Sequence, residues 1–228
     1  MNIVSGRFRH RKLHTNPGLI TRPITARVKV SLFDYIQPWL HDKRIADVYA
    51  GTGTMGFEAL SRGARSIVFF EQDKVAFELL KKNVAELKVE DETLCWKVDV
   101  TKCSFRPRGG DHMRPFDLVF FDPPYFHVEK MTAGSMIYKS LLRLAKPEIS
   151  AAAARLLFRV EQKSEYTVPP VWELEELLKY SSMEIGVYRK AGLPPETDGE
   201  GDDFDTSSNA GNDTGNDIVD DSETQNRE

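Results

Sequence analysis

The sequence predicts an α/β fold built on a mainly parallel, doubly wound sheet. Short apolar runs alternate with segments of helical periodicity from residue 45 onwards, and this alternation is typical of strand–helix–strand units. A glycine-rich turn separates the first apolar run from the first of these helical segments. The run Phe116–Phe121 is almost entirely apolar, as expected for a central parallel strand that is buried on both faces.

The individual elements follow from the spacing of the apolar residues. The expected strands are the apolar runs Ile45–Ala50, Ser66–Phe70, Thr93–Val98, Phe116–Phe121 and Ala154–Val160. The expected helices have apolar residues three or four positions apart and are Thr54–Arg62, Lys74–Leu87 and Met131–Ala145. Residues 172–190 are ambiguous between helix and strand, and we favour a closing antiparallel hairpin there.

Charge is distributed very unevenly along the chain, whose 228 residues carry a net charge of −4. Residues 1–44 hold nine lysines and arginines against two aspartates, whereas residues 191–228 hold twelve acids against one arginine. We therefore expect a basic N-terminal extension (1–44), a folded domain (45–190) and a disordered acidic tail (191–228) that is too polar to bury a core. A basic body favours a polyanionic partner such as a nucleic acid.

Several classes of protein are excluded by the composition. No apolar run approaches the roughly 18 residues of a membrane span, and the basic N-terminus has no signal-peptide core. The two cysteines, Cys95 and Cys103, match no zinc spacing, so we expect thiols in a reducing compartment, the cytoplasm. His112 and His127 have no paired carboxylate in the sequence, and we expect no metal.

The first indication of a ligand-binding site is the turn Gly51–Gly56. The turn fits G-x-G-x-x-G between a strand and a helix, and Glu71 follows twenty residues after Gly51; this pattern is the fingerprint of a dinucleotide site. Asp47 argues against a dinucleotide, because a carboxylate at the strand end would repel a pyrophosphate and attract an ammonium group. S-adenosylmethionine carries an ammonium and a sulfonium group and no phosphate.

Three acids at three successive strand ends suit such a cationic nucleoside. Asp47 would face the ammonium group, Glu71 the ribose hydroxyls and Asp99 the adenine amine. The predicted cofactor contacts are Asp47, Ala50, Gly51, Thr52, Gly53, Gly56, Glu71, Gln72 and Asp99. The alternative is that Asp47 and Asp99 only cap turns.

The strongest signal is the tetrapeptide Asp122-Pro123-Pro124-Tyr125, directly after the apolar strand. Two prolines stiffen the loop and leave its carbonyl groups free to accept hydrogen bonds. The Asp122 carboxylate and the Pro123 carbonyl can then hold the two N–H bonds of an exocyclic amine. Tyr125 supplies a ring on which a flipped base can stack. We predict that these four residues form the catalytic loop of an amine methyltransferase; the alternative is an ordinary polar turn.

In these motifs the chain resembles the bacterial 16S rRNA guanine-N2 methyltransferases that act on guanine 966 of the small subunit. The stretches that carry the resemblance are Ile3–Gly6, Arg11–Leu13, Arg22–Phe33, Asp47–Gly53, Gly56–Ala64 and Asp122–Tyr125. It extends from Ile3 to Glu161 and more weakly to Tyr188. Tyr49 and Thr52 stand where the family often has Phe and Ser, and the acidic tail is additional.

The resemblance implies a Rossmann-like class I methyltransferase with a short N-terminal β/α extension that contacts RNA. It also implies S-adenosylmethionine as methyl donor and, as partner, 16S rRNA or a small-subunit assembly intermediate. We expect a monomer. The alternatives are a DNA, tRNA or other RNA amine methyltransferase, a protein-glutamine methyltransferase (which typically has Asn at position 122), an NAD-linked oxidoreductase and a non-catalytic RNA-binding module.

The N-terminal residues support an RNA contact independently. If Ile3–Lys12 is a strand, then Arg7, Arg9 and Arg11 share one face and form a stripe able to follow phosphates. The predicted RNA-binding residues are Arg7, Arg9, Arg11, Lys12, Arg22 and Arg27. The alternative is a solvent-exposed edge strand without a partner.

Overall fold

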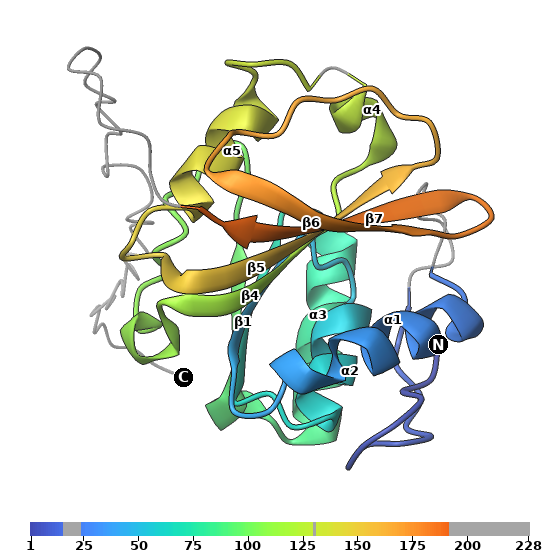
Figure 1. Ribbon diagram of the computed structural model, residues 1–228. Helices are drawn as coiled ribbons and strands as arrows, with labels where there is room; N and C mark the ends of the chain where they lie inside the picture. Colours follow the sequence, from blue (N-terminus) through green and yellow to red (C-terminus); the bar gives the residue numbers. More distant parts are fainter. Residues whose placement is uncertain (16–23, 130, 192–228) are drawn as a thin grey trace, which may run out of the picture. The chain divides into compact units, whose positions relative to one another are not determined.

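The computed structural model describes residues 1–15, 24–129 and 131–191. The predicted RNA-binding residue Arg22 and the predicted acidic tail, apart from its first residue, lie outside the described residues. Within the described part, seven strands form one sheet in the order β3-β2-β1-β4-β5-β7-β6 (Figure 1). The three-part division of the chain remains a prediction.

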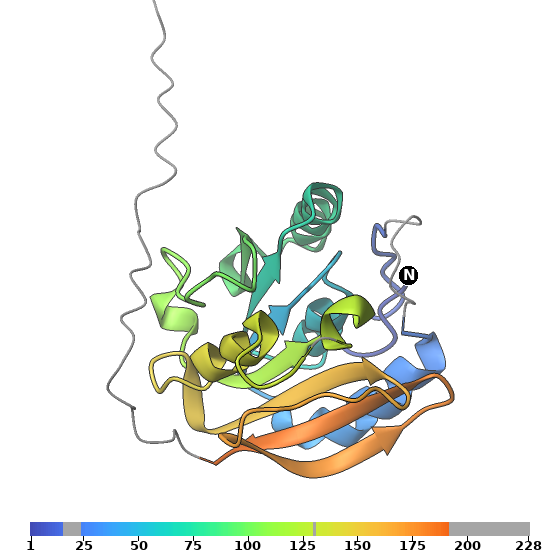
Figure 2. The ribbon, with the colours of Figure 1, turned by 90° about the horizontal axis from the view of Figure 1, so that it is seen from above.

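The first five strands are parallel and the last two close the sheet as an antiparallel hairpin. Their bounds are β1 Arg44–Val48, β2 Ser66–Glu71, β3 Thr93–Lys97, β4 Phe116–Phe121, β5 Ser150–Glu161, β6 Trp172–Lys179 and β7 Met183–Lys190. The strands predicted from apolar runs are confirmed, and so is the closing hairpin, whose β7 lies between β5 and β6. Figure 2 shows this hairpin at the outer edge of the sheet.

The helices are α1 Ala26–Ile36, α2 Thr54–Ser61, α3 Lys74–Leu87, α4 Tyr125–Val128 and α5 Met136–Leu144, with short 3-10 turns at Gln37–Trp39, Glu90–Glu92 and Asp111–Met113. The prediction Met131–Ala145 was too long at its start. Gly134 has a positive φ of 83°, and the Ser135 side chain caps the helix by accepting a hydrogen bond from Tyr138 N. The helix therefore begins at Met136.

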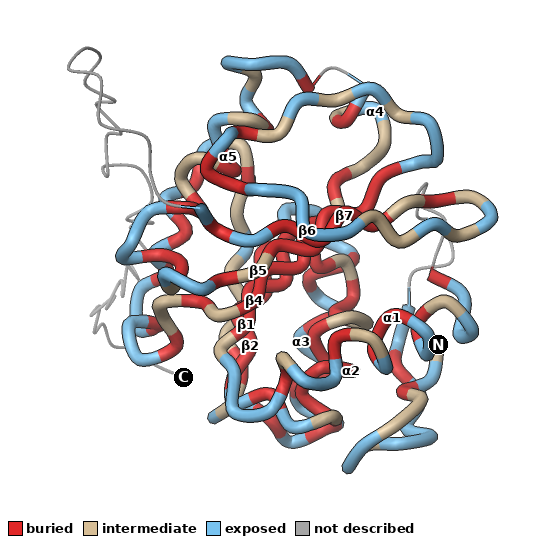
Figure 3. The backbone as a smooth tube through the Cα atoms, in the orientation of Figure 1, coloured by how far each residue is buried: buried red, intermediate tan, exposed pale blue. Residues whose placement is uncertain are grey.

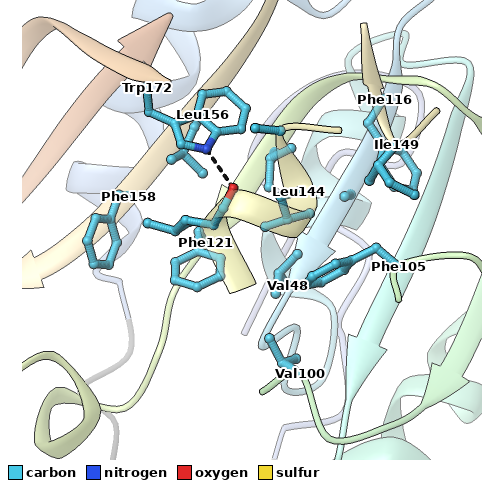
Figure 4. Packing of buried hydrophobic residues seen from close by; sticks show 14 of the residues in the cluster. Val48, Val100, Phe105, Phe116, Phe121, Leu144, Ile149, Leu156, Phe158 and Trp172 are labelled. Atoms are coloured by element: carbon cyan, nitrogen blue, oxygen red, sulfur yellow. Dashed lines mark hydrogen bonds between the residues drawn. The ribbon is translucent and has the colours of Figure 1, made fainter. Parts of the chain in front are cut away.

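The sheet separates two hydrophobic cores, and its central strands are buried along their length (Figure 3). One core packs α5 and the loop around Phe105 against the sheet, and the other packs α1, α2 and α3 against the opposite face. In the first core the Trp172 indole donates a hydrogen bond to the Leu141 carbonyl at 2.9 Å (Figure 4). Cys95 and Cys103 are free thiols.

The N-terminal residues form a tight hairpin, so the predicted strand across Ile3–Lys12 is wrong. The chain reverses at Gly6, where φ is 79° and an added Cβ would lie 1.8 Å from the Ser61 carbonyl oxygen. Among the described residues outside the named strands, the only β-bridge is the antiparallel one between Asn2 and Lys12. Ile3 and Leu13 are buried in the same core as α1 and α2, so the hairpin is part of the folded body.

A buried ionic cluster fixes this hairpin to the body. The Glu58 carboxylate on α2 accepts hydrogen bonds from the Val4 and Ser5 amides at 2.9 and 3.1 Å. Lys29 on α1 lies 3.1 Å from Glu58 and donates to the Asn2 carbonyl at 2.9 Å. Both side chains are almost completely buried, with exposures of 1% for Lys29 and 0% for Glu58. Burial lowers the pKa of Lys29, and the Glu58 charge opposes that effect.

Candidate functional site

The predicted site residues gather at the carboxyl edge of the parallel strands. Asp47 is the second-last residue of β1, Glu71 ends β2, Asp99 follows β3 and Asp122 follows β4. In an open parallel sheet, ligands bind at this edge, where the strand order reverses. Here the order reverses between β1 and β4, and the glycine-rich turn starts from β1.

Each glycine of the turn Gly51–Gly56 is required for a different physical reason. Gly51 has a φ of 56° and open space where a Cβ would stand, so the backbone is accessible there. Gly53 has a φ of 82°, and a Cβ would meet the Phe57 ring at 2.5 Å. A Cβ on Gly56 would lie 2.3 Å from the Phe69 ring, so Gly56 allows α2 to pack closely on β2.

Asp47 is the most strongly perturbed acid of the site. It is only 2% exposed, and its Oδ2 accepts a hydrogen bond from the Gly56 amide at 2.9 Å. Burial raises the pKa of Asp47 to about 8; the Gly56 hydrogen bond opposes the rise, and the charges of Asp122 and Glu71 add to it. No cationic side chain of the described residues pairs with it, so a cationic ligand fits this position.

Glu71 holds the glycine turn as well as facing the site. Its two oxygens accept hydrogen bonds from the Gly51 amide at 2.6 Å and the Asp73 amide at 2.7 Å. Burial raises the pKa of Glu71 against these hydrogen bonds. Gln72 beside it is exposed. A carboxylate already fixed by backbone amides keeps lone pairs with which to accept further hydroxyl donors.

The remaining predicted cofactor contacts lie on the flanking loops. Asp99 accepts hydrogen bonds from both the amide and the hydroxyl of Thr101, at 2.9 and 2.7 Å, and these bonds lower its pKa against burial. The Thr52 carbonyl accepts a hydrogen bond from Asn83 Nδ2 at 2.9 Å. The Ala50 amide donates to the Phe70 carbonyl, which holds the start of the turn on β2.

The catalytic loop begins where β4 ends. The Asp122 amide donates to the Val48 carbonyl at 3.2 Å, so the loop starts beside β1. The Pro124 carbonyl accepts from His127 N at 2.9 Å as α4 starts. No hydrogen bond to the Pro123 carbonyl is found in the described part of the chain. Tyr125 is partly exposed at the first position of α4.

Sequence reasoning missed a cationic partner of Asp122. The Arg159 guanidinium on β5 donates from Nε to Asp122 Oδ1 at 2.5 Å. Arg159 was overlooked because it lies inside the strand predicted over Ala154–Val160. A signal was present: a charged residue between Phe158 and Val160 in a buried strand needs a partner. Glu58, inside the predicted helix Thr54–Arg62, and Lys29, before the first predicted strand, were also not singled out as a buried pair.

The predicted RNA-binding cations do not form one stripe. The Arg7 guanidinium pairs with Glu92 and lies 4.5 Å from the Phe8 ring centroid. The Arg11 guanidinium donates to the Glu86 carbonyl at 2.8 Å. The other predicted cations within the described residues are exposed and are Arg9, Lys12 and Arg27. Two of the predicted cations are therefore already engaged by Glu86 and Glu92 of the folded body.

Among the described residues, no helix is both long and apolar enough to cross a membrane. No group of three or more His, Cys, Asp or Glu side chains in the same residues could hold a metal ion.

The sheet order, the glycine turn after β1 and the buried acids at the ends of β1 and β2 define a class of protein. This is a Rossmann-like methyltransferase that uses S-adenosylmethionine. The uncompensated carboxyl group of Asp47 and the open backbone at Gly51 fit that cationic cofactor.

The chain belongs to the family described as Conserved hypothetical protein 95, whose sequence profile matches residues 1–188. It is 38% identical over 192 residues to ribosomal RNA small subunit methyltransferase D of Haemophilus influenzae, a match that covers 83% of this chain and 92% of that protein. The Escherichia coli protein of the same name is 37% identical over 127 residues, which cover 55% of this chain and 60% of that protein.

Solved structures agree with this assignment. The putative methyltransferase yhhF of Escherichia coli superposes with a TM-score of 0.68 at 28% identity, covering 83% of this chain and 97% of that one. The putative methylase HI0767 of Haemophilus influenzae gives a TM-score of 0.62 at 28% identity, covering 85% and 98%. A putative RNA methyltransferase of Pyrococcus horikoshii, at 20% identity, shares the fold with a TM-score of 0.55.

Proposed function

We propose that this protein transfers a methyl group from S-adenosylmethionine to the exocyclic N2 amine of a guanine in 16S rRNA. The observation that carries the proposal is the position of Asp122. Its carboxylate lies at the carboxyl edge of the sheet, directly after β4, which pairs with the strand that carries Asp47. The relatives of the chain are named as small-subunit rRNA methyltransferases. These relatives favour rRNA over DNA, tRNA or protein as the acceptor.

Four groups of this chain would hold the cofactor. The Asp47 carboxyl group would ionise against the ammonium group, and Glu71 would accept from the ribose hydroxyls. Asp99 would face the adenine amine, while the turn Gly51–Gly56 would approach the ligand with its backbone. Ala50, Thr52 and Gln72 flank these groups. When bound, S-adenosylmethionine supplies an electrophilic methyl group on its sulfonium sulfur.

The catalytic loop would orient the acceptor. Asp122 and the Pro123 carbonyl would each accept one N–H of the guanine amine, which directs the nitrogen lone pair out of the plane of the base. Pro124 keeps the loop stiff, and Tyr125 would stack on the flipped base. An amine nitrogen is a poor nucleophile, so orientation in a dry site supplies most of the rate enhancement.

The RNA itself would contact the N-terminal hairpin and α1. Exposed cations there include Arg9, Lys12 and Arg27, and phosphate contacts of this kind dominate affinity for nucleic acids. Because the relatives are named as methyltransferases of bacterial ribosomal RNA, we infer that the protein acts in the cytoplasm, and we propose that it acts as a monomer. Its substrate would be 16S rRNA, either free or in a small-subunit assembly intermediate.

Mass spectrometry of the methylated product tests the proposal. Purified protein is incubated with labelled S-adenosylmethionine and either naked 16S rRNA or small-subunit particles that lack the modification. We expect N2-methylguanosine at one position after nuclease digestion. Methyl transfer to adenine or cytosine, or transfer to DNA but not rRNA, would refute the guanine assignment.

The matched control is Asp122→Ala. It should lower turnover by about two orders of magnitude, as the loss of an orienting group commonly does, with little change in S-adenosylmethionine affinity by calorimetry. Loss of cofactor binding by a folded Asp122→Ala variant would move Asp122 from the acceptor to the cofactor. Binding of NAD but not S-adenosylmethionine would favour the oxidoreductase alternative.

A further inference from the structure

Asp122 and Arg159 form a pair across neighbouring strands. Phe121 at the end of β4 lies opposite Phe158 on β5, so the next residues on each strand, Asp122 and Arg159, reach the same face of the sheet. Nε of Arg159 donates to Oδ1 of Asp122 at 2.5 Å. Arg159 is only 6% exposed, whereas the Asp122 side chain is 24% exposed. The pair is therefore buried on the arginine side and open on the carboxylate side.

The surroundings of the pair are apolar. Asp122 and Arg159 border a cavity of about 20 Å³. The other residues lining it are Ile24, Leu32, Met55, Phe120, Phe121, Leu157 and Ile185, which come from the segment before α1, from α1 and α2, and from strands β4, β5 and β7. None of these side chains titrates. The charged group that acts on the pKa of Asp122 is Arg159 on β5, and the Asp122 charge in turn raises the pKa of Asp47 on β1.

Burial and the arginine have opposite effects on Asp122. Burial raises the pKa of Asp122, and both the charge and the hydrogen bond of Arg159 lower it. The ionisation state matters, because a protonated carboxyl group presents an O–H donor, whereas an ionised carboxylate only accepts. An amine that offers N–H groups needs acceptors.

We propose that Arg159 is a positioning residue that holds the Asp122 carboxylate ready to accept the hydrogen bonds of the acceptor amine. The inference rests on the proposed function, in which Asp122 holds that amine. Arg159 fixes Oδ1, and Oδ2, for which the described residues show no hydrogen bond, would accept from the amine. Without the arginine, the carboxyl group becomes protonated at a higher pH and loses its fixed orientation.

The test compares the pH dependence of kcat for the full-length protein and its Arg159→Met and Arg159→Lys variants, with rRNA as acceptor. We expect Arg159→Met to lower kcat about tenfold to hundredfold near pH 6 and to move the acid limb of the profile to higher pH. The KM for S-adenosylmethionine should stay unchanged. Arg159→Lys retains the charge and should restore the position of the acid limb. An acid limb unchanged in Arg159→Met would overturn the proposal.

The matched control is Arg155→Met. Arg155 is a second arginine on β5, and it pairs with Glu175 and lies over the Trp39 ring. This variant should leave the acid limb where it is in the wild type. If circular dichroism shows that Arg159→Met does not fold, Arg159→Gln replaces it and is compared in the wild-type and Asp122→Asn backgrounds. Asparagine does not titrate, so Arg159→Gln should lower kcat near pH 6 less than about threefold in the Asp122→Asn background. An equal loss of kcat in both backgrounds would show that Arg159 acts independently of Asp122 and would overturn the proposal.

The product of the wild-type reaction separates this inference from the proposed function. Methyl transfer to an acceptor other than guanine N2 would refute the proposed function alone. The comparison of acid limbs would still test Arg159 on whichever amine is methylated.

Discussion

Replacing Glu58 by alanine tests how the N-terminal hairpin is held. The carboxylate is fully buried and accepts from the Val4 and Ser5 amides. It also pairs with Lys29 at 3.1 Å and with Arg62 Nε at 3.1 Å. Its removal leaves the buried Lys29 ammonium with the Asn2 carbonyl as its remaining hydrogen-bond partner among the described residues, and it leaves two backbone amides without their acceptor.

The magnitude follows from these losses. Removing one partner of a buried ion pair costs about 3–5 kcal/mol, and each partly buried amide left unpaired adds about 1 kcal/mol. Local relaxation and water entry recover part of this, so we expect a loss of about 4 kcal/mol. Total stabilities of about 5–15 kcal/mol are usual for a domain, so Glu58→Ala should be close to unfolding.

Urea unfolding followed by circular dichroism measures the effect. With a slope near 2 kcal/mol per M, the midpoint should fall by about 2 M at unchanged slope. Glu86→Ala is the control, because Glu86 links α3 to His14 of the same segment through an exposed pair worth about 0.5 kcal/mol. A midpoint shift below about 0.5 M for Glu58→Ala would show that the cluster does not hold the hairpin.

Three further predictions concern ligands. Asp47, whose pKa is raised to about 8, must lose a proton to face an ammonium group, so S-adenosylmethionine affinity should rise between about pH 5.5 and 7, by up to about tenfold per pH unit. Calorimetry should find a flatter pH dependence for Asp47→Asn, and equal slopes would remove Asp47 from the ammonium site. Replacing Arg9, Lys12 and Arg27 by serine should weaken RNA binding and reduce the salt slope by about one unit per lost phosphate contact. An unchanged slope in a filter-binding titration would move the RNA site elsewhere. Deleting residues 191–228 should leave thermal stability unchanged and tighten binding to non-specific RNA at low salt only; equal affinities with and without the segment would leave it a solubility role.

The strands of the sheet and the helices that cover it could be predicted because each is determined by residues close together in the sequence. The run Phe116–Phe121 can only be buried, and Lys74–Leu87 has both an apolar face and a capping Asp73, so both elements have the predicted bounds. The glycine turn and the acids at strand ends were predictable for the same reason. They depend on position within one strand–turn–helix unit.

The features that were missed depend on contacts far apart in the sequence. Alternating arginines suggested a strand, but the chain reverses at Gly6 because the close contact with Ser61 fixes the backbone there. The Asp122–Arg159 pair requires β4 and β5 to be neighbours in a particular register, which apolar periodicity does not specify. The start of α5 depends on a positive φ at Gly134, which the apolar spacing of Met131–Ala145 does not reveal.

The buried side chain of Asn83 connects two regions that the proposed function keeps apart. Its Nδ2 donates to the Thr52 carbonyl in the glycine turn and to the His14 carbonyl after the hairpin, and its Oδ1 accepts from the His14 amide. One amide group therefore spans the cofactor turn and the segment proposed to bind RNA. If RNA binding shifts that segment, the hydrogen bonds of Asn83 change, and the affinity of the glycine turn for the cofactor changes with them. Thermodynamic reciprocity then requires the cofactor to change RNA affinity by the same factor.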